Sequence, residues 1–114
     1  MRDSAKHYGR QAENLAAALL EQNGLEVLAR NVRAGNDEID ILARDGPVLV
    51  LVEVKARSRG FEAADLAFTH AKRQRLMRAW RRLVAERRVG WSAAVRCDLI
   101  LVATNGLTTH IRDV

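Results

Sequence analysis

One segment limits the possible folds more than any other part of the chain: EIDILARDGPVLVLVEVKAR at residues 38–57. Apolar residues at every second position from Ile39 to Ala43 predict a strand with one covered face. The Asp45-Gly46 pair then predicts a tight turn. Positions 48–54 are apolar except at Glu53, which is typical of a central strand covered on both sides. The segment therefore predicts a hairpin inside a sheet.

The rest of the chain supplies helices and further strands around this hairpin. The predicted elements are a helix over 5–23, strands over 25–33, 39–43 and 48–54, a helix over 70–88, and strands over 94–104 and 106–114. Helical spacing makes Leu15 and Trp80 parts of the two buried helix stripes. The order α-β-β-β-α-β-β is that of an α/β protein with a mixed sheet packed against at least two helices.

Length and composition exclude several classes of protein. With 114 residues, 48% of them hydrophobic, the chain is expected to form one domain over 1–114. A single cysteine excludes an internal disulfide and argues against a zinc cluster. No apolar run approaches the roughly 20 residues of a membrane helix, and residues 1–22 lack the uninterrupted apolar stretch and the cleavage pattern of a signal peptide. Five aromatic residues are too few for a base-stacking platform. We expect a cytoplasmic protein without a membrane partner.

The net charge of +5 is concentrated in the second half of the chain. Residues 72–88 contain eight basic side chains against one acid, Glu86: Lys72, Arg73, Arg75, Arg78, Arg81, Arg82, Arg87 and Arg88. A solvated helix face is the commoner reason for such a run, but solvated faces usually mix both signs of charge. Arginine donates two hydrogen bonds at once to a phosphate. The run therefore predicts a polyanionic partner, nucleic acid first, bound by residues such as Arg73, Arg78 and Arg82.

The hairpin also carries a candidate catalytic group. Side chains alternate along a strand, so Glu53 and Lys55 project from the same side. Pairing across the Asp45-Gly46 turn places Asp40 opposite Glu53, with β-carbons about 5 Å apart. Two carboxylates so close repel unless a cation lies between them or one is protonated. Mg²⁺ favours one or two carboxylates together with waters and phosphate oxygens. Lys55 lies beside these two carboxylates and can act on a water. Asp40, Glu53 and Lys55 together therefore predict metal-assisted phosphodiester hydrolysis.

Two further side chains are predicted to reach this group. Glu13, on the flank of the first helix's buried stripe, would add a third carboxylate. Lys72, at the start of the second helix, would reach the scissile phosphate or structure the metal shell. Asn31 and Arg33 precede the acidic strand and are candidate substrate contacts. Taken singly, each acid is more often an ordinary surface residue or a partner in a plain ion pair. Their expected convergence favours a site.

These motifs resemble the YraN-like family, small bacterial proteins that are Holliday-junction-resolvase-like and belong to the PD-(D/E)XK nuclease superfamily. The matching positions are Gly9, Ala12, Glu13, Asn31, Arg33, Glu38, Ile39, Asp40, Val52, Glu53, Val54, Lys55, Arg57, Lys72, Arg75, Leu76 and Asp98. The chain departs from the family pattern at Asp37, where glycine is usual, and at Ala56, where threonine is usual. Asp37 adds negative charge to the loop expected to approach DNA.

The resemblance implies a restriction-endonuclease-like fold and an Mg²⁺- or Mn²⁺-dependent endodeoxyribonuclease, acting on branched or repair DNA. Asp40 and Glu53 would bind the metal, Lys55 would assist the attacking water, and Glu13 would support the site. It adds Arg57, Lys72 and Arg75 to the candidate DNA contacts. Two alternatives stay open: an inactive nucleic-acid-binding module, and an adaptor that uses the basic helix against an acidic protein.

Two residues outside this group have separate interpretations. A resolvase cuts two strands symmetrically and so would need a homodimer, for which the loop around Trp91 is a candidate contact. Asp98 opens a buried strand, where we expect a structural hydrogen-bonding role rather than a metal ligand.

Overall fold

The computed structural model describes residues 2–57, 70–89 and 94–114. Its elements are α1 (Arg2–Gln22), β1 (Glu26–Ala34), β2 (Asp37–Asp45), β3 (Val48–Arg57), α3 (His70–Ala85), β4 (Val95–Ala103) and β5 (Thr108–Ile111). The predicted order α-β-β-β-α-β-β is confirmed. Neither described helix contains a stretch long and apolar enough to span a membrane.

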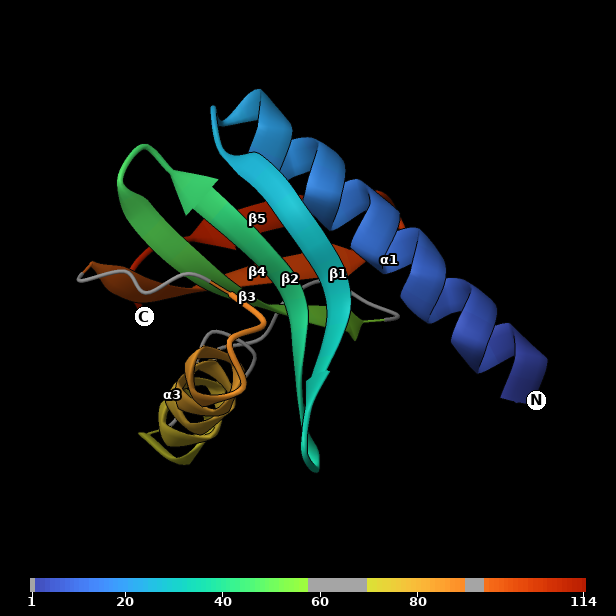
Figure 1. The fold of residues 1–114 in the computed structure, drawn as a ribbon. Helices are drawn as coiled ribbons and strands as arrows, with labels where there is room; N and C mark the ends of the chain where they lie inside the picture. Colours follow the sequence, from blue (N-terminus) through green and yellow to red (C-terminus); the bar gives the residue numbers. More distant parts are fainter. Residues whose placement is uncertain (1, 58–69, 90–93) are drawn as a thin grey trace.

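The five strands form one sheet in the order β1-β2-β3-β4-β5. Adjacent strands are antiparallel except for the central pair β3 and β4, which run parallel. A parallel connection needs a crossover, and α3 lies in it. As Figure 1 shows, α1 covers one face of the sheet and α3 the other. This mixed α/β architecture is compatible with a restriction-endonuclease-like fold.

Each helix buries an apolar stripe against its own face of the sheet, α1 mainly over β3 and β4 and α3 mainly over β2 and β1. On the α1 side, Ala16 and Leu20 pack with Val52, and on the α3 side, Trp80 and Leu83 pack with Leu51. The apolar run from Val48 to Val52 in β3 is thus explained by core on both faces of the sheet. Trp80 is buried as predicted. Leu15 was expected in the α1 stripe and is exposed instead, because the stripe that meets the sheet runs through Ala12, Ala16 and Leu20.

The end of α3 differs from the prediction. The helix stops at Ala85 rather than at residue 88. Arg87 adopts a left-handed conformation with φ of 57°, and its N–H donates to the Val84 carbonyl while the Arg88 N–H donates to the Leu83 carbonyl. This pair of bonds closes a helix in a Schellman motif. Helical periodicity alone does not predict this end of the helix, because Arg87 occupies the position where glycine is usual.

The regular strand pattern breaks at Asp40. Ile39 and Ile41 were expected on one face, yet Ile39 packs in the α3-side core and Ile41 in the α1-side core. On the neighbouring strand, Asn31 lies between the pairs that β1 forms with Ile41 and Ile39, and it has φ of 53°. A left-handed residue inside a strand redirects the side chains next to it. The irregularity on both strands leaves Asp40 between the two sheet faces.

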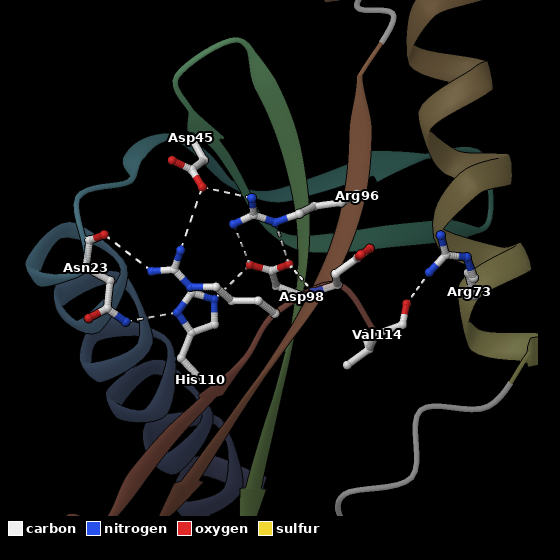
Figure 2. A network of polar contacts seen from close by, with 9 residues as sticks. Asn23, Asp45, Arg73, Arg96, Asp98, His110 and Val114 are labelled. Carbon is white, nitrogen blue, oxygen red and sulfur yellow. Dashed lines mark hydrogen bonds and ion pairs between the residues drawn. The ribbon is translucent and has the colours of Figure 1, made fainter.

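A buried polar network around Asp98 in β4 connects the sheet to Asn23, the residue directly after α1 (Figure 2). Asp98 is fully buried and accepts hydrogen bonds from the Arg96 guanidinium, from the backbone N–H of Asp113 and, at 2.7 Å, from His110 Nε2. The network continues from Arg96 to Asp45 and from His110 to Asn23. Burial alone would raise the pKa of Asp98, but the bonds from His110 and Arg96 outweigh it and hold the pKa at about 2. The expected structural role of Asp98 agrees with these contacts.

Replacing Asp98 with asparagine is expected to lower the free energy of unfolding at pH 7 by about 3 kcal/mol, because it removes the buried carboxylate that binds both Arg96 and His110 and leaves Arg96 paired with the more exposed Asp45. Since the folded pKa lies below the ordinary value of 3.8, this stabilisation is complete above pH 4 and is lost as the pH falls toward 2. Urea unfolding of wild type and Asp98→Asn at pH 7 and at pH 3 measures both effects. Asp113→Asn, at an exposed carboxylate, is the control. Equal stability of Asp98→Asn and wild type at pH 7 would contradict the assignment.

Candidate active site

Asp40 is fixed where the β2–β3 ladder ends. The last paired residues on this side are Ile41 and Val52, and beyond them the Asp40 Oδ2 accepts a 2.8 Å hydrogen bond from the Val54 N–H. A buried backbone N–H needs an acceptor, and here a carboxylate takes the place of a strand partner. The fold therefore determines where the Asp40 carboxylate points, independently of any ligand.

Asp40 and Glu53 line the same hollow, of about 300 Å³, on the α3 side of the sheet. We call it the acidic hollow; its lining residues are Asn36, Asp37, Glu38, Asp40, Glu53, Arg75 and Leu76. Glu53 is 15% exposed, and its Oε1 accepts a 3.1 Å hydrogen bond from Arg75. Its Oε2 is buried and has no hydrogen-bond partner within the described part of the chain. An unpaired buried carboxylate oxygen is costly, which makes this atom a candidate ligand for a cation.

The charge on Asp40 is unfavourable in the folded protein. Burial raises the pKa of its carboxyl to about 6, the Val54 N–H opposes the change, and the negative charges of Glu53 and Glu13 add to it. A carboxyl whose pKa is raised by burial and by neighbouring negative charges is typical of functional sites. A bound cation would remove this penalty.

Lys55 follows on the same strand and is also buried, with 8% of its surface exposed. Its pKa is lowered to about 8, first by burial and then by the Lys72 ammonium, while Glu53 acts in the opposite direction. Arg57 lowers the pKa of Lys55 further. Lys55, Arg57 and Lys72 thus bring three positive groups together beside Glu53. A lysine in such surroundings can exchange a proton near neutral pH.

Glu13 meets Asp40 from the opposite side. The two residues line a smaller hollow of about 100 Å³ under α1, with Gly9, Ala12, Val54 and Ala56. Asn31 donates a 2.9 Å hydrogen bond to Glu13 Oε1, and Arg30 lies 3.5 Å from the same oxygen. The three carboxylates expected in one cleft are therefore divided: Asp40 is shared, Glu53 lies toward α3, and Glu13 lies toward α1.

The arginines expected to bind DNA differ in their surroundings. Arg33 and Arg82 are exposed, and Arg57 is partly buried. Three others contact the body of the protein: Arg73 donates to the Val114 carbonyl (Figure 2), Arg75 to Glu53, and Arg78 through two bonds to Asp37. Asp37, the residue that departs from the family pattern, is thus neutralised by α3. The Arg78 bonds hold the pKa of Asp37 below its usual range.

Comparison with known proteins identifies the family. The model of the family described as "Uncharacterised protein family UPF0102" matches residues 12–102 of this chain. The chain belongs to this family. A UPF0102 protein of Nitratidesulfovibrio vulgaris is 41% identical over 117 residues, covering 99% of this chain and 87% of the relative. A UPF0102 protein of Halorhodospira halophila is 43% identical over 114 residues, covering 98% and 89%. One of Geobacter metallireducens is 36% identical over 110 residues, covering 96% and 89%.

The UPF0102 match spans both sides of the site, from Glu13 in α1 to the end of β4. In the described ranges, no three histidine, cysteine, aspartate or glutamate side chains are arranged to share one ion. A cation in the acidic hollow would have Glu53, through its Oε2, and Asp40 as its carboxylate ligands, since Asp37 is paired with Arg78. This donor set fits Mg²⁺ or Mn²⁺, which bind through few carboxylates and keep waters or phosphate oxygens.

Sequence reasoning missed how Glu13 is held. Asn31 was expected to contact substrate, and the contact of Arg30 with Glu13 was not foreseen. A signal was present, because asparagine is disfavoured in strands and tolerates a left-handed backbone. An asparagine between Arg30 and Val32 in a predicted strand marks an irregular position.

Replacing Asp40 with asparagine is expected to stabilise the protein at pH 7 by about 2 kcal/mol, since the folded pKa of about 6 lies above the ordinary 3.8. The amide oxygen can still accept from Val54, so the backbone contact is kept. The gain should shrink as the pH falls through 6 and vanish below 4, where the carboxyl is protonated in both states. Urea unfolding at pH 7.5 and at pH 3.5 measures it, with exposed Asp113→Asn as the matched control. A loss of stability at pH 7.5 would contradict the electrostatic account of this site.

Proposed function

We propose that this UPF0102 protein is a metal-dependent endonuclease that hydrolyses phosphodiester bonds of DNA, with branched or repair intermediates as the substrate class. The observation that carries the proposal is the buried Glu53 Oε2, which has no hydrogen-bond partner among the described residues, in the hollow that also contains Asp40. Few structural roles leave a carboxylate oxygen in this condition, whereas a cation ligand needs a free lone pair.

Asp40 and Glu53 would hold the cation, Mg²⁺ or Mn²⁺, which would supply positive charge beside the attacked phosphate and the leaving oxygen. The chain's own contribution is to fix both carboxylates. Val54 holds Asp40, and Arg75 holds one oxygen of Glu53 while leaving the other open. Such preorganisation removes the need to reorient ligands during the reaction.

Lys55 is the candidate proton acceptor. Its pKa of about 8 leaves a neutral fraction at physiological pH, and that fraction can take a proton from water. The water oxygen then forms a bond to phosphorus while the bond from phosphorus to the leaving 3′ oxygen breaks, and solvent returns a proton to that oxygen. Lys72 keeps the pKa of Lys55 low and would contact the phosphate itself.

The positive residues around the site would bind the DNA backbone. The candidates are Arg33, Arg57, Lys72, Arg73, Arg75, Arg78 and Arg82. Arg75 and Arg78 are paired with Glu53 and Asp37, and the remaining donors of each guanidinium are available to phosphate oxygens. Symmetric cleavage of a branched substrate would require a homodimer. The candidate contact for it, Trp91, lies outside the described residues.

Replacing Glu53 with glutamine or Lys55 with methionine is expected to reduce cleavage by at least about 100-fold. The first change removes the charge that holds the cation and the second removes the proton acceptor. The assay follows linear, nicked, single-stranded and four-way DNA in Mg²⁺ or Mn²⁺. Glu26→Gln makes the same chemical change at an exposed carboxylate paired with Arg44 and should cleave as wild type does.

Three outcomes separate the interpretations. Cleavage by wild type that is lost in both variants supports the nuclease. DNA binding by all variants without cleavage by any of them would favour a nucleic-acid-binding module. No binding even at low salt would favour an adaptor, because phosphate contacts strengthen steeply as salt falls.

A further inference from the structure

A second hollow lies on the outer side of α3. The side of the helix that packs on the sheet carries the buried residues Leu76, Ala79, Trp80 and Leu83. On the rest of its surface is a hollow of about 340 Å³, lined by residues that recur every three or four positions and therefore share one stripe of the helix. We call it the basic hollow; its lining residues are His70, Arg73, Gln74, Met77, Arg78 and Arg81.

The charged side chains of the basic hollow all have the same sign. Within the described part of the chain no carboxylate lines it, whereas four carboxylates line the acidic hollow. Arg73, Arg78 and Arg81 supply three positive charges, and Asp37 offsets one of them through its ion pair with Arg78. Two positive charges remain in excess. An anion with two negative charges would match this excess.

Two of the three arginines are held in place by the protein. Arg73 donates to the Val114 carbonyl, and Arg78 donates to both carboxylate oxygens of Asp37. A guanidinium has five N–H donors, so each arginine keeps donors for a ligand. Gln74 is exposed between them and adds an amide donor. Side chains that are already held lose less conformational entropy when a ligand binds.

We propose that the basic hollow binds a terminal phosphate monoester of a DNA strand. At neutral pH a monoester carries close to two negative charges and three strong acceptor oxygens, whereas each phosphodiester inside a strand carries one negative charge. The inference rests on the proposed function and narrows its substrate class to DNA with a phosphorylated strand end. Both a 5′ end and a 3′ end can carry this group.

Arg78 connects the basic hollow to the candidate active site. Its partner Asp37 lines the acidic hollow together with Asp40 and Glu53. The two hollows lie on different sides of α3, and a helix with its side chains is roughly 10 Å wide. A strand whose end lies in the basic hollow would therefore reach the acidic hollow within a few nucleotides, so that cleavage should fall near the phosphorylated end.

The test compares three forms of one internally labelled DNA strand, with a 5′-phosphate, with a 3′-phosphate, or with hydroxyl groups at both ends. Kd is measured by fluorescence anisotropy in Ca²⁺, a cation chosen to limit turnover. We expect wild type to bind one of the phosphorylated strands about 10-fold more tightly than the hydroxyl strand, and the preferred strand identifies the end. Arg81→Ala should reduce this preference to about 3-fold or less. Gln74→Glu, which places a carboxylate in the hollow, should abolish it.

Both substitutions are at exposed positions, and unchanged urea midpoints would verify that the variants fold. Arg44→Ala is the control. It also removes one positive charge, from an exposed arginine of β2 that pairs with Glu26 outside the hollow, and it should keep the wild-type preference.

Equal affinity of wild type for the three strands would overturn the subsite, and cleavage of DNA in Mg²⁺ by the same protein would leave the nuclease supported. A preference that persists in both Arg81→Ala and Gln74→Glu would also overturn the subsite. Failure of wild type to bind any strand would overturn both the subsite and the proposed function. A preference lost in both variants, without cleavage in Mg²⁺, would support the subsite and contradict the nuclease alone.

Discussion

The hydrogen bond from the Val54 N–H to the Asp40 carboxylate is the contact on which the site depends. It forms where β2 and β3 stop pairing, so it satisfies a backbone donor and orients a carboxylate at once. Because Val50, Leu51 and Val52 are buried in the middle of β3 and Val54 packs against the α1-side core, the position of Val54 is fixed by the core. The carboxylate is therefore held in place although its ionisation is opposed, as its pKa of about 6 indicates.

From this position Asp40 is accessible from both faces of the sheet. On the α3 side it joins Glu53, whose second oxygen is unpaired within the described residues. On the α1 side it faces Glu13, which Asn31 and Arg30 hold. The break in the strand pattern at Asn31 and Asp40 is what makes this two-sided arrangement possible. An unfavourable backbone conformation at such a point is typical of functional sites.

The sequence predicts what depends on local patterns and not what depends on distant pairs. Alternation and the Asp45-Gly46 turn give the hairpin, and the apolar run to Val54 gives the central strand. The contacts of Arg78 with Asp37 and of Arg30 with Glu13 join separate elements, and no spacing in the sequence encodes them. The division of the acids between two hollows follows from the left-handed Asn31, which strand periodicity does not anticipate. The basic run in α3 was visible, but not the ion pairs that Arg75 and Arg78 form with Glu53 and Asp37.

The most direct test is where a divalent cation binds. In a ¹H–¹⁵N NMR titration with Mn²⁺, the account predicts that the amide signals of Asp40, Glu53 and Val54 broaden first, and that Mg²⁺ reverses the effect by competition. In Glu53→Gln this selective broadening should disappear while the remaining spectrum stays that of a folded protein. Broadening centred on exposed carboxylates such as Glu26 or Glu86, unchanged in Glu53→Gln, would contradict the central claim that Asp40 and Glu53 form a cation site.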